Sequence, residues 1–346
     1  MILPTRLTPK LTVLFVLFAL AVTAGLGSFV YVIGRSALLE ATISGLNSAA
    51  LEKEAALDQW FDEGRRDVIR IARTEHIGRQ VRELTLEAPG SAVGRKLART
   101  MRDELGQWAG KDGTYESMFV IEADRGEVII STDPRDEGMF KENRPYFVNG
   151  RLAPYLQNPY YSITRQAPGA VASAPIRTTE GKVIGVLAAR LKLSEMNAIV
   201  GRRTGLHETD DSYLVDASHL LVTQPRLVGD PSVLQRGIYT PAVDRCLAGE
   251  HVTEIGTDFR GVPVIGVYRW LAERRLCLVT KISAAEALED VRRLGKAILM
   301  SALLVLISAA LIATVLACIV TRPVLALQAG AAAIGRGDRT KRLPET

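Results

Sequence analysis

The sequence predicts an α+β protein in which two tandem modules with antiparallel sheets follow a long N-terminal helix, flanked by two transmembrane helices. Three observations lead to this fold class. The 346-residue chain has an uncharged apolar run near each end, a helical apolar pattern directly after the first run, and a β-rich pattern that occurs twice in between. A chain of this length can form two or more domains with their own cores.

The two apolar runs cover residues 11–33 and 297–321 and contain no charged residue. At ~1.5 Å per residue each is long enough to cross a hydrocarbon layer of ~30 Å. The first run could also be a cleaved signal peptide, but it exceeds the ~7–15 apolar residues of a signal core. We therefore interpret both runs as membrane helices.

The charge distribution predicts the orientation. Residues 1–10 carry a net charge of +2 and residues 322–346 a net charge of +3, which together account for the whole formal charge of +5. Basic flanks remain in the cytoplasm, and long loops cross largely regardless of their charge. We expect both termini in the cytoplasm of a bacterial cell, with the neutral residues 34–296 in the periplasm, outside the inner membrane.

Several function classes lack a signal in the sequence. The pI of about 9.1 comes from the basic ends, and no basic stripe is interleaved with aromatic residues, so we expect no nucleic-acid partner. The four histidines are scattered, and we interpret the run "HETDD" (residues 207–211) as a solvated linker. No phosphate loop or nucleophile elbow is present. We expect no enzyme activity in this region, no cofactor and no metal.

Two of the three cysteines, Cys246 and Cys277, fall in the predicted periplasmic segment, where an oxidising compartment permits a disulfide. Nothing in the sequence fixes the distance between them, and we favour two independent buried thiols.

A long helix is expected to continue out of the first membrane run, because no proline occurs between Pro9 and Pro89. Apolar residues recur mostly three or four positions apart along it. Such a stripe fits either a partner helix or the protein's own domain. The stripe consists of Leu39, Ile43, Leu46, Ala50, Leu57, Trp60, Phe61, Val68 and Ile71.

The segment that follows contains an internal repeat. "FVIEADRGEVIISTDPR" (residues 119–135) matches "YLVDASHLLVTQPR" (residues 213–226), and "GKVIGV" (residues 181–186) matches "GVPVIGV" (residues 261–267). The offsets are 94 and roughly 81 residues, in the same order, which indicates two related modules. Alternating Val, Ile, Tyr and Phe between glycine turns predict antiparallel strands in both.

Two small α/β modules on a long helix, closed by a second span, resemble the double Cache domain of bacterial receptors, whose modules are PAS-like. After the second span, "TRPVLALQAGAAAIGRGDRTKRLP" resembles the start of a HAMP linker. The expected boundaries are 1–10 for the cytoplasmic N-terminus, 11–33 for the first span, 34–84 for the long helix, 85–204 for the membrane-distal module, 205–296 for the membrane-proximal module with its exit helix, 297–321 for the second span, and 322–346 for a partial HAMP linker.

The stretch "KENRPYF" (residues 141–147) makes the resemblance specific. Cache receptors for α-amino acids have an arginine that clamps the carboxylate, two aromatic residues after it, a later tyrosine, and an aspartate in the last strand. By position, these correspond to Arg144, to Tyr146 and Phe147, and to Tyr160 or Tyr161. The aspartate position holds Arg190, which would repel an ammonium group.

The reversed charge suggests a ligand with a second anionic end. The periplasmic domains of four-carbon dicarboxylate sensor kinases look similar, with Arg-Pro-Tyr-Phe and a basic residue on the last strand. Arg144 and Arg190 would then each bind one carboxylate, and Ser162 and Thr164 would add hydroxyl donors. The alternative is that Arg190 faces solvent together with Lys192.

The resemblance implies a signalling receptor that binds a small organic anion in the distal module and works as a homodimer in the membrane. The proximal module would be a spacer, because it has no counterpart of "NRPYF". The output could be a histidine kinase, or a chemotaxis (methyl-accepting) or diguanylate cyclase domain, and a catalytic domain beyond residue 346 is left open. The alternative of another class is a membrane-anchored periplasmic capture protein or enzyme.

Overall fold

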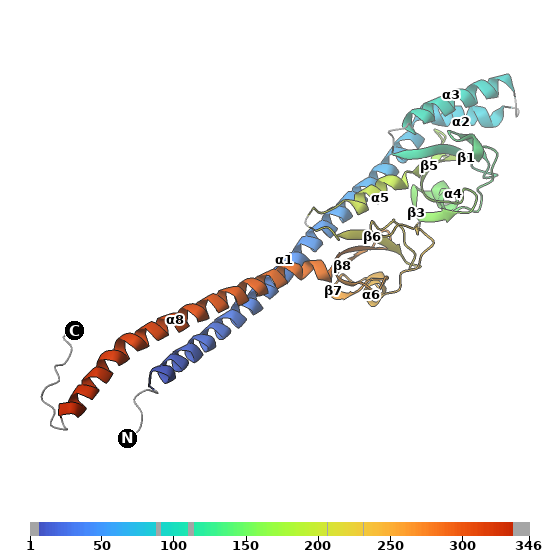
Figure 1. Cartoon of the computed structure of the whole chain (residues 1–346). Coiled ribbons are helices and arrows are strands. Elements are labelled where there is room, and N and C mark those ends of the chain that lie inside the picture. Colours follow the sequence, from blue (N-terminus) through green and yellow to red (C-terminus); the bar gives the residue numbers. More distant parts are fainter. Residues whose placement is uncertain (1–6, 88–90, 110–113, 206, 231, 335–346) are drawn as a thin grey trace. The chain divides into compact units, whose positions relative to one another are not determined.

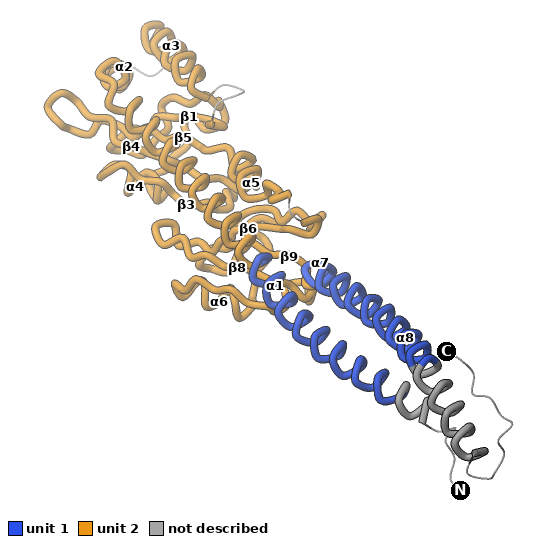
Figure 2. Tube along the Cα trace, turned by 90° about the vertical axis from the view of Figure 1, so that its left-hand side faces the viewer, with its two compact units in different colours: residues 1–42, 285–346 blue, residues 43–284 orange. Residues whose placement is uncertain are grey.

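The computed structural model describes residues 7–87, 91–109, 114–205, 207–230 and 232–334. The chain divides into two compact units, which Figure 2 shows in different colours. We call residues 1–42 with 285–346 the helical unit, and residues 43–284 the α+β unit. The expected HAMP features at Gly337, Asp338 and residues 342–344 lie outside the described residues.

The helical unit contains the first part of helix α1 (Leu7–Ala72) and helix α8 (Glu289–Ile334), which follows the short helix α7 (Ala284–Ala287). Both long helices are apolar and long enough to cross a membrane, as the sequence predicted. Their large apolar side chains point outward, which suits a lipid environment. The two helices approach closely at Gly34, where an added Cβ would lie 2.5 Å from Leu294 Cδ2.

Helix α1 ends at Ala72, and the expectation that it continues to residue 84 is wrong. Thr74 adopts an extended conformation (φ −68°, ψ 122°), and helix α2 (Glu75–Leu86) begins after it. The change of direction lets Ile77 and Val81 become buried. Threonine has a low helix propensity, and the Thr74 hydroxyl donates to the Arg70 carbonyl of α1 at 3.2 Å and does not cap α2.

The apolar stripe of α1 packs within its own unit rather than on a partner helix. Seven of its nine residues are buried by the α+β unit: Leu46, Ala50, Leu57, Trp60, Phe61, Val68 and Ile71. Lys53 on the same helix is also buried, and its Nζ donates to the Val200 carbonyl and to Ser212 Oγ, both at 2.8 Å. The stripe therefore gives no support to a homodimer.

The distal module contains a five-stranded antiparallel sheet in the order β2-β1-β5-β4-β3. Figure 1 labels β1, β5 and β3 of this sheet. Helix α4 packs on β4 and β5, over a core that includes Phe119, Tyr146 and Phe147. The strands are β1 (Tyr115–Glu122), β2 (Val128–Ser131), β3 (Tyr155–Ser162), β4 (Ala167–Arg177) and β5 (Val183–Leu191); the helices are α2, α3 (Ala92–Trp108), the 3-10 turn η2 (Pro134–Asp136), α4 (Pro145–Leu152) and α5 (Leu193–Gly201).

The proximal module contains a four-stranded antiparallel sheet in the order β6-β9-β8-β7. Its strands are β6 (Asp211–Asp216), β7 (Val252–Thr257), β8 (Pro263–Leu271) and β9 (Leu276–Ser283), and helix α6 (Pro241–Leu247) packs on β8 and β9. The two-module architecture with antiparallel sheets on a long helix confirms the predicted fold class.

The strand order corrects one of the two repeat matches. In each module the last strand pairs with the first, so β5 is equivalent to β9 and β1 to β6. The stretch "GKVIGV" begins β5, whereas "GVPVIGV" begins β8, so that match joins strands at different places in the sheet. The two stretches are alike because each begins in a tight turn with a glycine at positive φ, Gly181 or Gly261, and continues into a strand.

Cys246 and Cys277 form a disulfide, with Cα atoms 5.9 Å apart, so the preference for two independent thiols is wrong. The bond joins α6 to β9 inside the proximal core. The contact could not be predicted from the sequence, because the two cysteines are 31 residues apart and only the fold packs α6 against β9.

Candidate functional site in the distal module

Arg144 directly precedes α4 and is exposed at the edge of the distal core. Pro145 occupies the first helical turn, where a missing N–H costs nothing. Within the described part of the chain, the Arg144 guanidinium has no hydrogen-bond or ion-pair partner. Its charge nevertheless acts on Lys141, Tyr146 and Tyr160, which places it beside them.

Tyr146 and Phe147 point into the distal core, where they are 2% and 4% exposed. Tyr146 makes an edge-to-face contact with Phe119, at 6.0 Å between ring centroids. Burial is the main reason why the pKa of the Tyr146 hydroxyl is raised, so it remains a neutral hydrogen-bond donor. The two rings form an apolar wall behind Arg144.

Alternation along β3 separates the remaining candidates. Tyr160 is half-buried and packs on the same core as Tyr146, whereas Tyr161 faces outward and is 39% exposed. Ser162 Oγ accepts a hydrogen bond from the Arg165 backbone N–H at 3.4 Å, and Thr164 is exposed. The charge of Arg144 acts on Tyr160, which the structure therefore brings near it, whereas Tyr161 and Thr164 face solvent.

Arg190 is buried, with only 5% of its side chain exposed, and does not face solvent. It shares the core side of β5 with Val186 and Ala188, and its guanidinium lies 5.7 Å from the Phe119 ring centroid. One guanidinium nitrogen donates to Ser117 Oγ at 2.8 Å and contacts Asp136 Oδ2 at 3.4 Å. The solvent-facing alternative for Arg190 is wrong.

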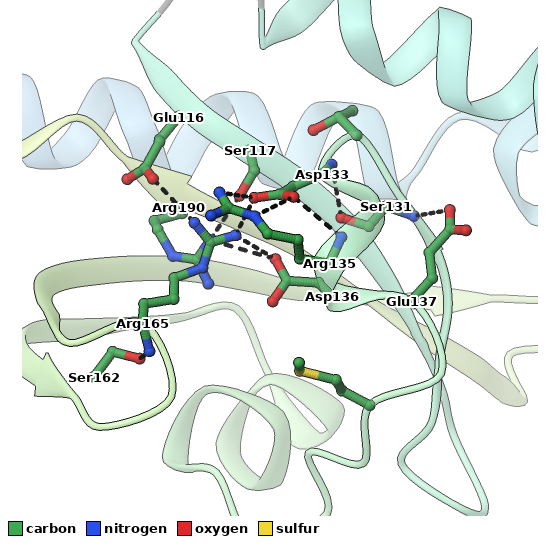
Figure 3. Close-up of polar contacts among 12 residues, drawn as sticks. Glu116, Ser117, Ser131, Asp133, Arg135, Asp136, Glu137, Ser162, Arg165 and Arg190 are labelled. Carbon is green, nitrogen blue, oxygen red and sulfur yellow. Dashed lines mark hydrogen bonds and ion pairs between the residues drawn. The ribbon is translucent and has the colours of Figure 1, made fainter.

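Asp136 is the centre of a charged cluster that the sequence did not reveal. It is 3% exposed, and Figure 3 shows the guanidinium groups of Arg165 and Arg190 directed toward it. Arg165 donates to Asp136 Oδ2 at 2.8 Å, and Lys141 Nζ lies 3.9 Å from Asp136 Oδ1. Burial lowers the pKa of Lys141, and the three neighbouring arginines lower it further, while Asp136 opposes this.

Asp133 forms the outer edge of the cluster. It accepts hydrogen bonds from Arg135 and Arg165, and these bonds hold the pKa of its carboxyl group well below the usual range. Arg165 also donates to the half-exposed Glu116 at 3.1 Å. Asp133 is therefore ionised near neutral pH.

The cluster carries an excess of positive charge. Lys141, Arg165 and Arg190 surround Asp136, and Arg165 also pairs with Asp133. Glu116 and Arg135 at the edge add one charge of each sign. Arg144, whose charge acts on Lys141, adds a further positive charge without an ion-pair partner among the described residues. Because the cluster adjoins buried aromatic rings, it can bind an anion that has a small apolar body.

A cavity of about 590 Å³ lies elsewhere in this module, between the end of α1, helix α2 and the β4–β5 turn. Its basic lining residues, Arg73, Arg79, Arg82 and Arg177, are all exposed. We call the charged residues around Asp136 the Arg190 cluster. We consider it a better candidate for the ligand site than the cavity, because buried charges among aromatic rings mark functional sites more often than solvated charges do.

The "HETDD" run was misinterpreted as a solvated linker. Asp210 and Asp211 are 4% and 3% exposed, and Asp211 begins strand β6. Among the described residues, no group of three or more His, Cys, Asp or Glu side chains is arranged to hold a metal ion.

No protein-family model and no curated protein matches the chain. Solved structures do match. The sensor domain of the V. cholerae histidine kinase DctB is 16% identical, with a TM-score of 0.51, over 72% of this chain and 98% of that chain. The ligand-binding domain of the Pseudomonas fluorescens chemoreceptor CtaA, solved with L-isoleucine, is 15% identical, with a TM-score of 0.50, over 74% of this chain and 98% of that chain.

A third match, an extracellular ligand binding receptor from Desulfohalobium retbaense, is 11% identical, with a TM-score of 0.45. The match covers 69% of this chain and 39% of that one. The neighbours are double Cache sensor domains of histidine kinases and chemoreceptors. At these identities the likeness is one of fold.

Proposed function

Starting from the double Cache fold, we propose that this chain is a transmembrane receptor whose distal module binds a small organic anion with one or two carboxylates. The observation that carries the proposal is the buried Arg190 cluster, in which cations outnumber acids beside an aromatic wall. A membrane-anchored enzyme or capture protein gains no comparable support from the described residues.

In the proposed complex, Arg144 binds one carboxylate of the ligand through paired N–H bonds. Its guanidinium is exposed and unpaired within the described residues, so binding breaks no existing contact. Tyr146 and Phe147 pack against the carbon skeleton of the ligand, and Tyr160 packs against one side of it. Arg190 attracts the second anionic end, because its fixed guanidinium has further N–H donors beyond the one that Ser117 accepts.

The main test is Arg144→Ala in the full chain, purified in detergent and titrated calorimetrically with the carboxylate that gives the largest thermal shift. Four-carbon dicarboxylates such as succinate head the panel. A hydrogen bond to a charged group contributes ~1.5–3 kcal/mol, so affinity should fall roughly 10- to 150-fold. Arg144→Lys should recover only part of it. Because Arg144 is exposed, the melting temperature without ligand should not change.

Arg177→Ala is the matched control. Arg177 is an exposed arginine of the same module that lines the 590 Å³ cavity, away from the cluster. Affinity should stay within twofold of the unmodified protein. A loss of binding in Arg177→Ala but not in Arg144→Ala would move the ligand to that cavity and overturn the site.

The orientation, the HAMP linker and the homodimer belong to the same proposal. Residues 34–296 lie in the periplasm and both termini in the cytoplasm, on the basis of the basic ends of the chain. Signals pass through the second span and the HAMP linker to an output such as a histidine kinase. Reporter fusions at residue 150 and at the C-terminus should give periplasmic and cytoplasmic signals. A cytoplasmic signal at residue 150 would reject the orientation.

A further inference from the structure

The proximal module has a buried cation at the position equivalent to Arg190. In the distal sheet Arg190 of β5 pairs with Ser117 of β1, and in the proximal sheet Lys281 of β9 pairs with Asp211 of β6. Ser117 and Asp211 are 94 residues apart, which is the offset of the first repeat match. Lys281 is 2% exposed and continues the core side of its strand, as Arg190 does.

The aromatic surroundings of the two cations also correspond. Arg190 lies 5.7 Å from the ring centroid of Phe119, and Lys281 lies 5.2 Å from that of Tyr213, the equivalent residue on β6. Tyr146 makes an edge-to-face contact with Phe119, and Phe259 makes one with Tyr213, at 5.6 Å and 88°. The proximal module therefore repeats the cation and the ring on the first strand, while the second ring, Phe259, comes from the turn between β7 and β8 instead of from the helix that supplies Tyr146.

The two modules differ in what the cation binds. Lys281 Nζ donates to Asp258 Oδ2 at 2.6 Å, and the Asp258 side chain is 1% exposed. The same carboxylate accepts from Arg260 Nε at 2.9 Å, and from the backbone N–H groups of Arg260 at 2.8 Å and Val262 at 3.0 Å. Asp258 thus gives the module a fully bonded carboxylate next to Phe259, from the turn between β7 and β8.

Charge around Lys281 is balanced, in contrast to the distal cluster. Lys281 and Arg260 face Asp258 and Asp211, whose Oδ1 accepts from the Arg226 backbone N–H at 2.9 Å. No positive charge is left over within this group to attract a free anion. The arrangement explains how a module with the same construction can lack affinity for an external ligand.

We propose that the proximal module contains a carboxylate-binding site, built from Lys281, Tyr213 and Phe259, that is occupied by the chain's own Asp258. The module is then held permanently in the form that a bound carboxylate would produce. This inference does not depend on the ligand proposed for the distal module, because it concerns different residues and a different probe.

Removing the tethered carboxylate should create a site for a free one. In Asp258→Ala the missing group has the size of formate, and in Asp258→Gly it has the size of acetate. The melting temperature of the full chain in detergent should rise by about 3–5 °C when formate is present at ten times its Kd for Asp258→Ala. Acetate should act more strongly on Asp258→Gly than on Asp258→Ala, because its methyl group would clash with the alanine Cβ.

Three controls define a specific effect, each measured against sodium chloride at equal ionic strength. The unmodified protein and Asp258→Asn, whose sites are filled, should show no formate shift. Asp258→Ala combined with Lys281→Met should also show none, because the cation is gone. The distal ligand should still bind the single variants.

Equal shifts in formate and chloride for Asp258→Ala and Asp258→Gly would overturn the proposal. So would a formate shift that persists in the Lys281→Met double variant. Both single variants are expressed and purified in formate or acetate throughout, and failure to obtain folded protein in those salts as well as in chloride would count against a rescuable site.

Discussion

The two modules place a cation at the same point of the same strand and differ in the charge around it. Arg190 contacts Asp136 at 3.4 Å, and Asp136 also binds Arg165, while Arg144 remains exposed and unpaired among the described residues. Lys281 contacts Asp258 at 2.6 Å in a balanced group. The comparison indicates that the same arrangement of a strand cation and an aromatic ring can accommodate either a free ligand or a carboxylate of the chain itself. Which of the two it accommodates depends on the few charged residues around the cation.

The largest expected effect on stability comes from the proximal site, which Asp258 occupies. Asp258→Asn leaves the buried Lys281 without its ion-pair partner, which typically costs about 3–5 kcal/mol. The melting temperature should fall by about 6–20 °C in a thermal unfolding scan.

Asp136→Asn is the matched variant in the distal module, and it should lower the free energy of unfolding by less than Asp258→Asn does. Arg165 keeps its contacts with Asp133 and Glu116, and Arg190 keeps Ser117. A distal loss as large as the proximal one would show that Asp136 is as essential to its module as Asp258, and the contrast between the modules would disappear.

The disulfide gives a second way to separate the modules, with an intermediate effect. Cys246→Ser with Cys277→Ser should reduce the free energy of unfolding by about 2–4 kcal/mol, because the unfolded chain loses a cross-link. The affinity of the distal module for its ligand, measured by calorimetry on the full chain, should not change. If affinity also falls, the two modules are coupled more strongly than their separate cores suggest.

The smallest expected effect concerns the affinity of the charged cluster in the distal module for its ligand. Asp136→Asn removes a negative charge within about 10 Å of the proposed ligand, worth ~1.7 kcal/mol at an effective dielectric constant of ~20. Affinity for an anion should therefore rise roughly 10- to 20-fold in a calorimetric titration. A fall in affinity would mean that Asp136 accepts a hydrogen bond from the ligand, as it would from an ammonium group, and the ligand class would have to be revised.

The sequence was informative where the signal is local. The two apolar runs, the alternating strands and the pair "FVIEADRGEVIISTDPR" and "YLVDASHLLVTQPR" predicted the spans and the tandem modules, and "NRPYF" drew attention to Arg144, Tyr146 and Phe147. These patterns reflect periodicity and turn chemistry, which depend on neighbouring residues.

Contacts between residues that are distant in the sequence could not be predicted from it. Asp136 lies in a polar turn that looks solvated, and its burial depends on cations at positions 141, 165 and 190. The face of Arg190 depended on register, and Lys281 was missed because "GVPVIGV" was matched to the wrong strand. Applying the first offset of 94 to Ser117 would have pointed to Asp211, but only the sheet order identifies its partner on β9.

Lys53 has a mechanical consequence for both modules. Its ammonium group joins helix α1 to the end of α5 through the Val200 carbonyl and to the start of β6 through Ser212 Oγ. Burial lowers its pKa to about 8, so near neutral pH the group is mostly charged and must keep both oxygen partners. A rotation of one module against the other would break at least one of these two hydrogen bonds. One ammonium group on α1 therefore couples the position of the distal module to that of the proximal module.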